Sequence, residues 1–189
     1  MIMPPVIRIF FAIDLPESIK VSLGRFISDL KKNAKSKGIR WSKPENLHIT
    51  LQFMPEVRSE HLEGLAKHVR AELANVIHNI ALRFGDIHLF PSPYRPRVIV
   101  LDILPQDPLV ELSRNVGRGI TAMQYDIESR PFRAHLTLGR IKHHDTRLDF
   151  LSSMKAPETG DIAINEVVLF RSEPYEDGSH YSVLERIAL

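Results

Sequence analysis

The sequence predicts an α+β protein made of two similar lobes related by an approximate two-fold axis. Segments with strand character are interspersed with helices. Several of these strands follow one another directly, which favours antiparallel or mixed sheets over a doubly wound parallel sheet. A strand, a Leu-Pro pair, a helix and a second strand also occur in this order twice. We therefore expect a single bilobal domain over residues 1–189, with repeat units of roughly 6–54 and 95–141.

The first half of the chain opens with an apolar strand over residues 6–14. A helix follows from Pro16, a residue that is tolerated in the first turn, and ends at Gly38. A second strand is predicted over 46–53, and a second helix from 59 to about 76. The apolar stripes of the two helices consist of Ile19, Leu23, Phe26 and Leu30, and of Leu62, Leu65, Val69, Leu73 and Val76.

The middle of the chain repeats this order. A strand over 80–90, with a break at Gly85, precedes the second repeat unit. That unit has a strand over 97–104, a helix over 107–119 and a strand over 132–141.

The last part of the chain predicts a short helix and a final pair of strands. The helix is expected over 146–154, and the strands over 166–170 and 181–187. Asp177 and Gly178 are typical turn residues, so the two strands are expected to form a hairpin.

Composition narrows the chemistry that the chain can perform. Its 189 residues include nine histidines and no cysteine, and 43% of them are hydrophobic. The lack of cysteine excludes disulfides, thiolate nucleophiles, zinc fingers and iron–sulfur sites. The net charge of +2 predicts no strong general affinity for nucleic acid, so an RNA or nucleotide partner would need a local basic patch.

Hydropathy predicts a cytoplasmic protein without a membrane partner. No apolar run approaches the roughly 18 residues of a membrane span. The apolar run at 9–13 is short and is not preceded by the basic segment of a signal peptide.

Each repeat unit ends in an H-x-T-L motif, which begins at His48 in the first unit and at His135 in the second. Residues i and i+2 of a strand share a face, so each histidine lies beside its threonine, Thr50 or Thr137. If the lobes face each other, their cleft holds two imidazoles and two hydroxyls. One histidine can then take a proton from water while the other protonates a leaving oxygen, and the hydroxyls can bind phosphate oxygens. The pattern predicts acid–base phosphoryl chemistry.

A single His-x-Thr in a strand is usually structural, but two copies at matching points of a repeat favour a site. The motifs and the segments around them resemble the 2H phosphoesterase superfamily, specifically the RNA 2′,3′-cyclic phosphodiesterases, also called 2′-5′ RNA ligases. The resemblance covers essentially the whole chain. It is carried by RIFFAIDLP, RWSKPENLHITLQF, FPSPYRPRVIVLDI, RPFRAHLTLGRI, EVVLFRSE and GSHYSVLERI. Ala134 stands where the family usually has proline before the second histidine.

The resemblance implies a fold and a reaction. The family has two lobes with antiparallel sheets and flanking helices around a central cleft. It implies that His48 is the proton donor, that His135 is the proton acceptor, and that Thr50 and Thr137 hold the phosphate. A terminal RNA 2′,3′-cyclic phosphate would be hydrolysed to a 2′-phosphomonoester, with ATP-independent 2′-5′ joining of RNA ends as a further activity.

The partner implied by the resemblance is RNA with a 2′,3′-cyclic phosphate end, tRNA fragments among them. Neither H-x-T-L motif has a nearby carboxylate, so no metal and no cofactor are expected. The chain is expected to act as a monomer.

Four further residues are candidates for substrate binding. Arg133 shares the strand face of His135 and could bind phosphate, or could be a solvated edge residue. Arg140 lies five residues after His135, so strict alternation places it on the opposite face unless the strand bulges, although the resemblance favours a role. Phe10 could stack on a base or could be a core aromatic residue. Trp41 could likewise stack on a base, or could cap a hydrophobic edge.

Two other readings remain open from the sequence. A related 2H phosphodiesterase acting on a small cyclic nucleotide or a 2′-5′ oligonucleotide would use the same residues. A nucleotide-binding module that has lost catalysis would be favoured by the loss of one histidine, but both are present. Metal-dependent hydrolysis is disfavoured by the lack of carboxylates near the motifs.

Overall fold

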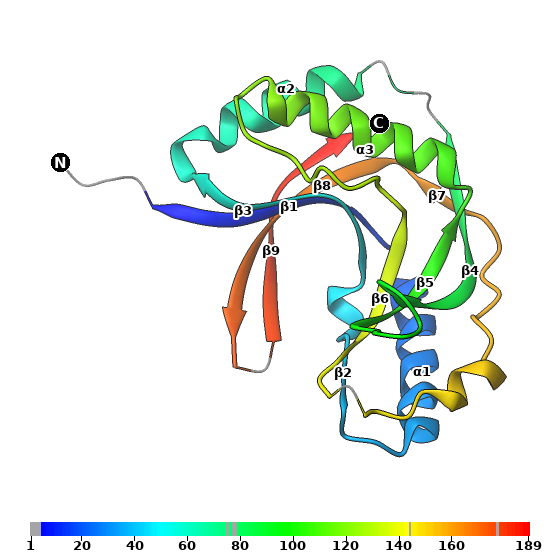
Figure 1. Cartoon of the computed structure of the whole chain (residues 1–189). Helices are drawn as coiled ribbons and strands as arrows, with labels where there is room; N and C mark the ends of the chain where they lie inside the picture. Colours follow the sequence, from blue (N-terminus) through cyan, green and yellow to red (C-terminus); the bar gives the residue numbers. More distant parts are fainter. Residues whose placement is uncertain (1–4, 75, 77–78, 144, 177) are drawn as a thin grey trace.

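Two antiparallel sheets form the framework of the protein (Figure 1), seen in a computed structural model that describes residues 5–74, 76, 79–143, 145–176 and 178–189. The first sheet has the strand order β3-β1-β8-β9, and the second has the order β2-β6-β5-β4-β7. The α+β prediction is confirmed. The strands are β1 (Val6–Asp14), β2 (Ile39–Trp41), β3 (His48–Arg58), β4 (Ile80–Phe90), β5 (Val98–Leu104), β6 (His135–Ile141), β7 (Ile162–Ile164), β8 (Glu166–Tyr175) and β9 (Gly178–Ala188).

In the described part of the chain, three α-helices cover the sheets: α1 (Glu17–Ala34), α2 (Leu62–Leu73) and α3 (Gln106–Thr121). Short 3₁₀ turns lie at η1 (Pro44–Asn46), η2 (Ser59–His61) and η3 (Asp149–Ser153). Within the described residues, none of the helices combines the length and the hydropathy needed to cross a membrane.

The predicted elements are found with changes at their ends. Residues 6–14 form β1 as predicted, whereas the segment predicted as a helix at 146–154 contains only the 3₁₀ turn η3. The strand predicted from residue 132 begins at His135, because the Gln106 side chain binds both the N–H and the C=O of Ala134. The three-residue strands β2 and β7 were not predicted. Asp177 of the predicted turn lies outside the described residues.

The helices are exchanged between the two sheets (Figure 1). Helix α1 follows β1 of the first sheet but lies beside the second sheet, and α3 follows β5 of the second sheet but packs with α2 on the first. The Ser113 hydroxyl of α3 donates to the Leu51 carbonyl of β3 at 2.8 Å. A Cβ atom at Gly119 would lie 2.6 Å from the Val69 backbone, so α3 can approach α2 closely only with glycine there. This exchange ties the two sheets together.

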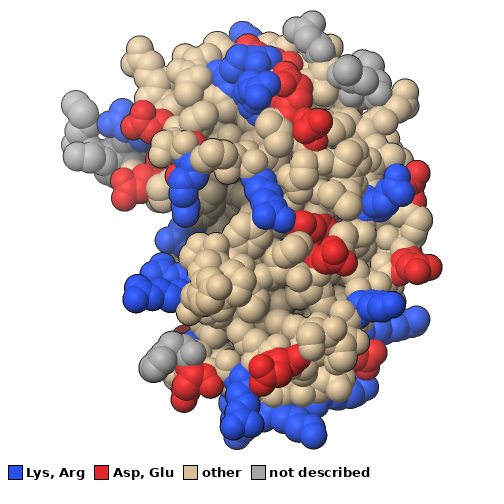
Figure 2. All heavy atoms as spheres, turned by 45° about the vertical axis from the view of Figure 1, so that its right-hand side comes forward, with Lys and Arg blue, Asp and Glu red and all other residues tan. Residues whose placement is uncertain are grey.

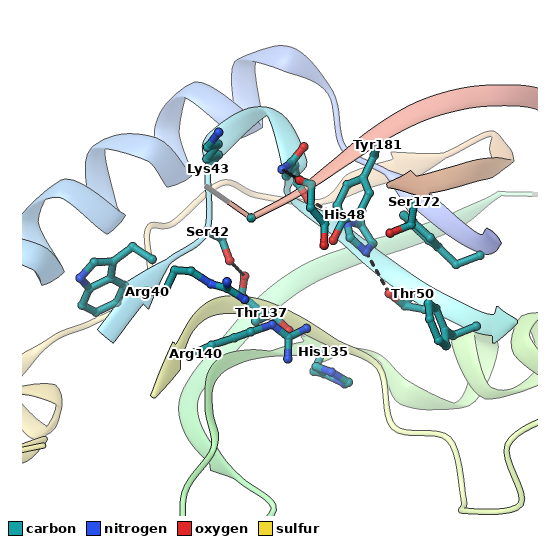
Figure 3. A pocket seen from close by; sticks show the side chains of 16 residues that line it. Arg40, Ser42, Lys43, His48, Thr50, His135, Thr137, Arg140, Ser172 and Tyr181 are labelled. Atoms are coloured by element: carbon teal, nitrogen blue, oxygen red, sulfur yellow. Dashed lines mark hydrogen bonds between the residues drawn. The ribbon is translucent and has the colours of Figure 1, made fainter. Parts of the chain in front are cut away.

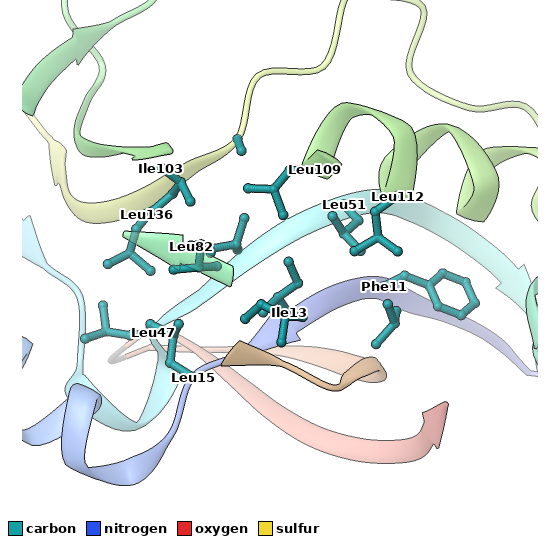
Figure 4. Packing of buried hydrophobic residues seen from close by; sticks show 14 of the residues in the cluster. Phe11, Ile13, Leu15, Leu47, Leu51, Leu82, Ile103, Leu109, Leu112 and Leu136 are labelled. Carbon is teal, nitrogen blue, oxygen red and sulfur yellow. The ribbon is translucent and has the colours of Figure 1, made fainter. Parts of the chain in front are cut away.

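One hydrophobic core extends over both sheets, and Figure 4 shows side chains from β1, β3, β4, β5, β6 and α3 packed together. A second, smaller cluster lies on the other face of the first sheet. It contains Phe10, Ala12, Val168 and Phe170, with Tyr181 packed against it. The first sheet is therefore apolar on both faces, and its smaller cluster faces the pocket described below.

Candidate active site

A pocket lies between the two sheets and brings the two predicted motifs together (Figure 3). His48 and Thr50 reach it from β3, and His135 and Thr137 reach it from β6. The remaining lining residues are Phe10, Arg40, Trp41, Ser42, Lys43, Asn46, Phe53, Arg140, Ser172, Gly178, Ser179 and Tyr181.

The two histidines are held by the same backbone contact. Nδ1 of His48 lies 2.7 Å from the Asn46 carbonyl oxygen, and Nδ1 of His135 lies 2.8 Å from the Arg133 carbonyl oxygen. In both cases the carbonyl belongs to residue i−2. Because a carbonyl only accepts, each Nδ1 carries a hydrogen in this arrangement, and Nε2 is left as the basic nitrogen of the neutral ring.

His48 lies in an aromatic environment. Its ring centroid is 4.7 Å from that of Phe10 and 5.2 Å from that of Tyr181. Its Nε2 accepts a hydrogen bond from the Thr50 hydroxyl at 2.9 Å. Burial lowers the pKa of His48 to about 4, and the positive charges of Lys20 and Arg140 act in the same direction. At neutral pH the unliganded site therefore holds His48 as a neutral imidazole.

His135 lies in a more open environment on β6. Its ring is 5.4 Å from Phe90 of β4, and the described residues give its Nε2 no hydrogen-bond partner. The Thr137 hydroxyl likewise has no protein partner within the described part of the chain, whereas the Thr137 carbonyl accepts from the Ser42 hydroxyl at 2.7 Å. The Nε2 atom and the Thr137 hydroxyl are thus available to a ligand in the pocket.

A β-bulge brings Arg140 into the pocket. In the pairing of β5 with β6, Ile99 faces Gly139 but Val100 faces Thr137, so Leu138 is an extra residue. The extra residue reverses the alternation and puts Arg140 on the face of Thr137. The carbonyl of Leu138 accepts from the Ser42 N–H at 2.9 Å, which stabilises the bulge.

Strand β3 has a bulge at the matching position. Phe11 faces Gln52 but Ala12 faces Thr50, so Leu51 is the extra residue and its carbonyl accepts from Ser113. The residue brought into the pocket is Phe53, five positions after His48, just as Arg140 lies five positions after His135. The two motifs thus share a bulge as well as a sequence pattern.

The structure places three of the candidate substrate residues, Arg133, Phe10 and Trp41, in packed or paired positions. Arg133 does not line the pocket, because its guanidinium binds both carboxylate oxygens of Asp102 at 2.8 and 2.7 Å and covers the Phe90 ring. Phe10 is only 2% exposed, so it packs under His48 and offers no open face to a base. Trp41 lines the pocket but packs against Gly139, and its buried indole N–H has no hydrogen-bond partner among the described residues.

Several lining residues were not predicted as site residues. Arg40 lies on β2 directly opposite Arg140, and Ser42 is the first residue after β2. The hairpin of β8 and β9 supplies another wall, and the Asn46 side chain holds it by donating to the Ser179 carbonyl at 2.9 Å. Sequence alternation could not place these residues, because β2 has three residues and the hairpin packs against the motif only in the folded chain.

Each histidine has one aspartate opposite it on the neighbouring strand, Asp14 for His48 and Asp102 for His135, and these carboxylates are bound by Lys20 and Arg133. Within the described residues, no three His, Asp or Glu side chains form a group that could hold a metal ion. The pocket instead combines two imidazoles, two threonine hydroxyls and the cations Arg40 and Arg140, a set suited to a phosphate group.

Two antiparallel sheets with paired histidines and basic side chains between them have the architecture of the 2H phosphoesterases. The family described as LigT like Phosphoesterase matches residues 13–100. An RNA 2′,3′-cyclic phosphodiesterase of Methanocaldococcus jannaschii is 30% identical, over 94% of this chain and 98% of the relative. One of Methanothermobacter thermautotrophicus is also 30% identical, over 95% of this chain and 97% of the relative.

Two solved structures are similar to this chain in fold and in sequence. The crystal structure of E. coli LigT complexed with 3′-AMP has a TM-score of 0.77 and 25% identity, over 98% of this chain and 99% of that chain. The crystal structure of E. coli LigT in apo form has a TM-score of 0.75 and 26% identity, over 98% of both chains. The chain belongs to the LigT-like phosphoesterase family.

Proposed function

We propose that the protein hydrolyses the terminal 2′,3′-cyclic phosphate of RNA to a 2′-phosphomonoester. The observation that carries this proposal is the matched pair of imidazoles, each fixed by a carbonyl at i−2 and each facing one pocket with Nε2. The names of the relatives in Methanocaldococcus jannaschii and Methanothermobacter thermautotrophicus support the choice of substrate.

In the proposed reaction, water attacks phosphorus and the bond between phosphorus and O3′ breaks. His135 takes the proton of the water at Nε2, and His48 gives the proton of its own Nε2 to O3′. Thr50 and Thr137 donate hydrogen bonds to the non-bridging oxygens, where negative charge develops. The histidines then exchange one proton through solvent, which returns the pair to its starting state.

The proton-donor role of His48 requires a charged ligand. Burial and the charge of Arg140 hold the pKa of His48 at about 4 in the unliganded site. A bound phosphodiester places a negative charge beside Nε2 and offsets the charge of Arg140, and both effects raise the pKa of His48. Substrate binding therefore supports protonation of the group that must act as acid.

A direct test uses an RNA oligomer that ends in a 2′,3′-cyclic phosphate, incubated with the protein in EDTA. We expect a product that ends in a 2′-phosphate, because O3′ is the leaving group. We expect it to form in EDTA, because every step above is assigned to protein side chains. A 3′-phosphate product would contradict the breaking of the bond to O3′. Loss of activity in EDTA would contradict catalysis by the histidine pair alone.

A further inference from the structure

One face of β6 carries a row of residues that leads out of the pocket. His135 and Thr137 are followed on this face by Arg140, because of the bulge at Leu138. The pairing with β2 continues beyond Arg140, since the Lys142 N–H donates to the Gly38 carbonyl at 2.8 Å. Lys142 is therefore two residues beyond Arg140 in the same ladder and lies on the same face. Its side chain is exposed.

The segment that joins α1 to β2 adds further positive charge at this end of the sheet. Lys35 and Lys37 are both exposed and precede Gly38, the pairing partner of Lys142. Arg147 is exposed nearby, in a groove that it shares with Lys35, Asp145 and Asp149. Figure 2 shows Lys and Arg side chains gathered at the lower end of the molecule, where α1 and β2 meet in Figure 1.

Three arginines on α2 and α3 are instead paired with carboxylates. Arg118 of α3 binds Glu72 of α2 at 2.8 Å. Arg114 binds Glu111 at 2.5 Å, and Arg70 binds Glu185. An arginine already paired with a carboxylate gives up that interaction when it binds a phosphate.

No such competition exists at the end of the second sheet. For Lys35, Lys37, Arg40, Arg140 and Lys142, the structure gives no ion pair within the described residues. Lys37 lies three positions before Arg40 in the sequence, so their Cα atoms are at most about 11 Å apart. The unpaired cations thus form a continuous path from the pocket to the surface, which is complementary to a polyanion.

We propose that the RNA strand attached to the reacting phosphate leaves the pocket along this path, over Arg40 and Arg140 and then over Lys142 and Lys37. The inference rests on the proposed function and adds the direction in which the substrate lies. It assigns phosphate-backbone binding to the end of the second sheet and none to α2 and α3. The path contacts backbone charge, so it favours no base sequence.

The test compares two substrates: a ten-nucleotide RNA with a 2′,3′-cyclic phosphate end, and 2′,3′-cyclic AMP, which has no strand. The variant is K37E/K142E, and the control with the same charge change is K67E/R114E on α2 and α3. We expect the ratio of kcat/KM for the oligomer to that for cyclic AMP to fall at least tenfold in K37E/K142E. In the control this ratio should change less than twofold.

Binding provides a second readout. The affinity for the same oligomer carrying a 2′-phosphate end should depend less steeply on salt in K37Q/K142Q, with a log–log slope smaller by about 0.7 per lost contact. An unchanged ratio and slope, or equal changes in the control, would overturn the path. If the wild type cleaved neither substrate, the proposed function would fail, but the binding slopes would still decide the path of the strand.

Discussion

The two histidine strands, β3 and β6, share a backbone design but differ in what surrounds their imidazoles. Both strands bulge at the leucine after the threonine, and both fix Nδ1 with the carbonyl of residue i−2. His48 is enclosed by aromatic rings and bonded to Thr50, whereas His135 has Phe90 beside it and an open Nε2. Identical motifs can therefore serve unequal roles, because the roles depend on what packs against each ring.

The different surroundings of the two imidazoles decide which histidine carries a proton before and after substrate binds. Acid–base hydrolysis needs one proton on the histidine pair. Since burial lowers the pKa of His48 to about 4, that proton reaches His48 when an anion occupies the pocket. This links proton placement to substrate binding.

The largest expected effect comes from removing either imidazole. We expect His48→Ala and His135→Ala each to lower kcat by about 10²–10⁴, the usual contribution of a general acid or base. The double variant should lose less than the product of the two, because the histidines act as a unit. Single-turnover cleavage of the cyclic-phosphate oligomer measures this loss. Near-normal turnover by either single variant would contradict the proposal that both histidines take part in catalysis.

A smaller effect is expected from the hydroxyls. Thr137→Val and Thr50→Val keep the side-chain shape but remove a donor to the phosphate oxygens, so each should lower kcat by about 10². The affinity for the 2′-phosphate product measured in parallel separates binding from catalysis. A change confined to KM would show that the hydroxyls bind substrate without stabilising the transition state.

The smallest expected effect is a shift in the pH profile. In the wild type, the acidic limb of the kcat/KM profile should lie near pH 4, where His48 gains a proton in the free protein. Tyr181→Ala opens the enclosure of His48 to water, which weakens the burial that lowers its pKa. The acidic limb should then move upward, toward the ordinary value of 6.5.

Tyr94→Ala serves as the matched control for this shift, because Tyr94 is 94% exposed and lies outside the pocket. An acidic limb that stays in place in Tyr181→Ala would show that aromatic enclosure does not set the pKa of His48.

The central residues of the pocket could be predicted from the sequence, whereas most residues of its walls could not. His48 with Thr50, and His135 with Thr137, could be predicted because alternation at i and i+2 needs only a strand. Arg140 could not be placed by alternation, since the bulge at Leu138 depends on Ser42 from a three-residue strand. The pairing of Arg133 with Asp102 could not be predicted, because Asp102 lies on a different strand.

The exchange of α1 and α3 between the sheets could not be predicted from the sequence either. An apolar helical stripe indicates that a helix is buried, but it does not indicate which sheet the helix covers. The bulge in β3 depends on this exchange, because the Leu51 carbonyl is bound by Ser113 of α3.

An NMR titration of the His48 imidazole, with and without a saturating 2′-phosphate mononucleotide, tests directly the coupling between His48 protonation and anion binding. We expect a pKa of about 4 in the free protein and a clear rise when the phosphate is bound. A free pKa near 6.5, or a value that the phosphate leaves unchanged, would contradict the claim that enclosure keeps His48 neutral until an anion arrives.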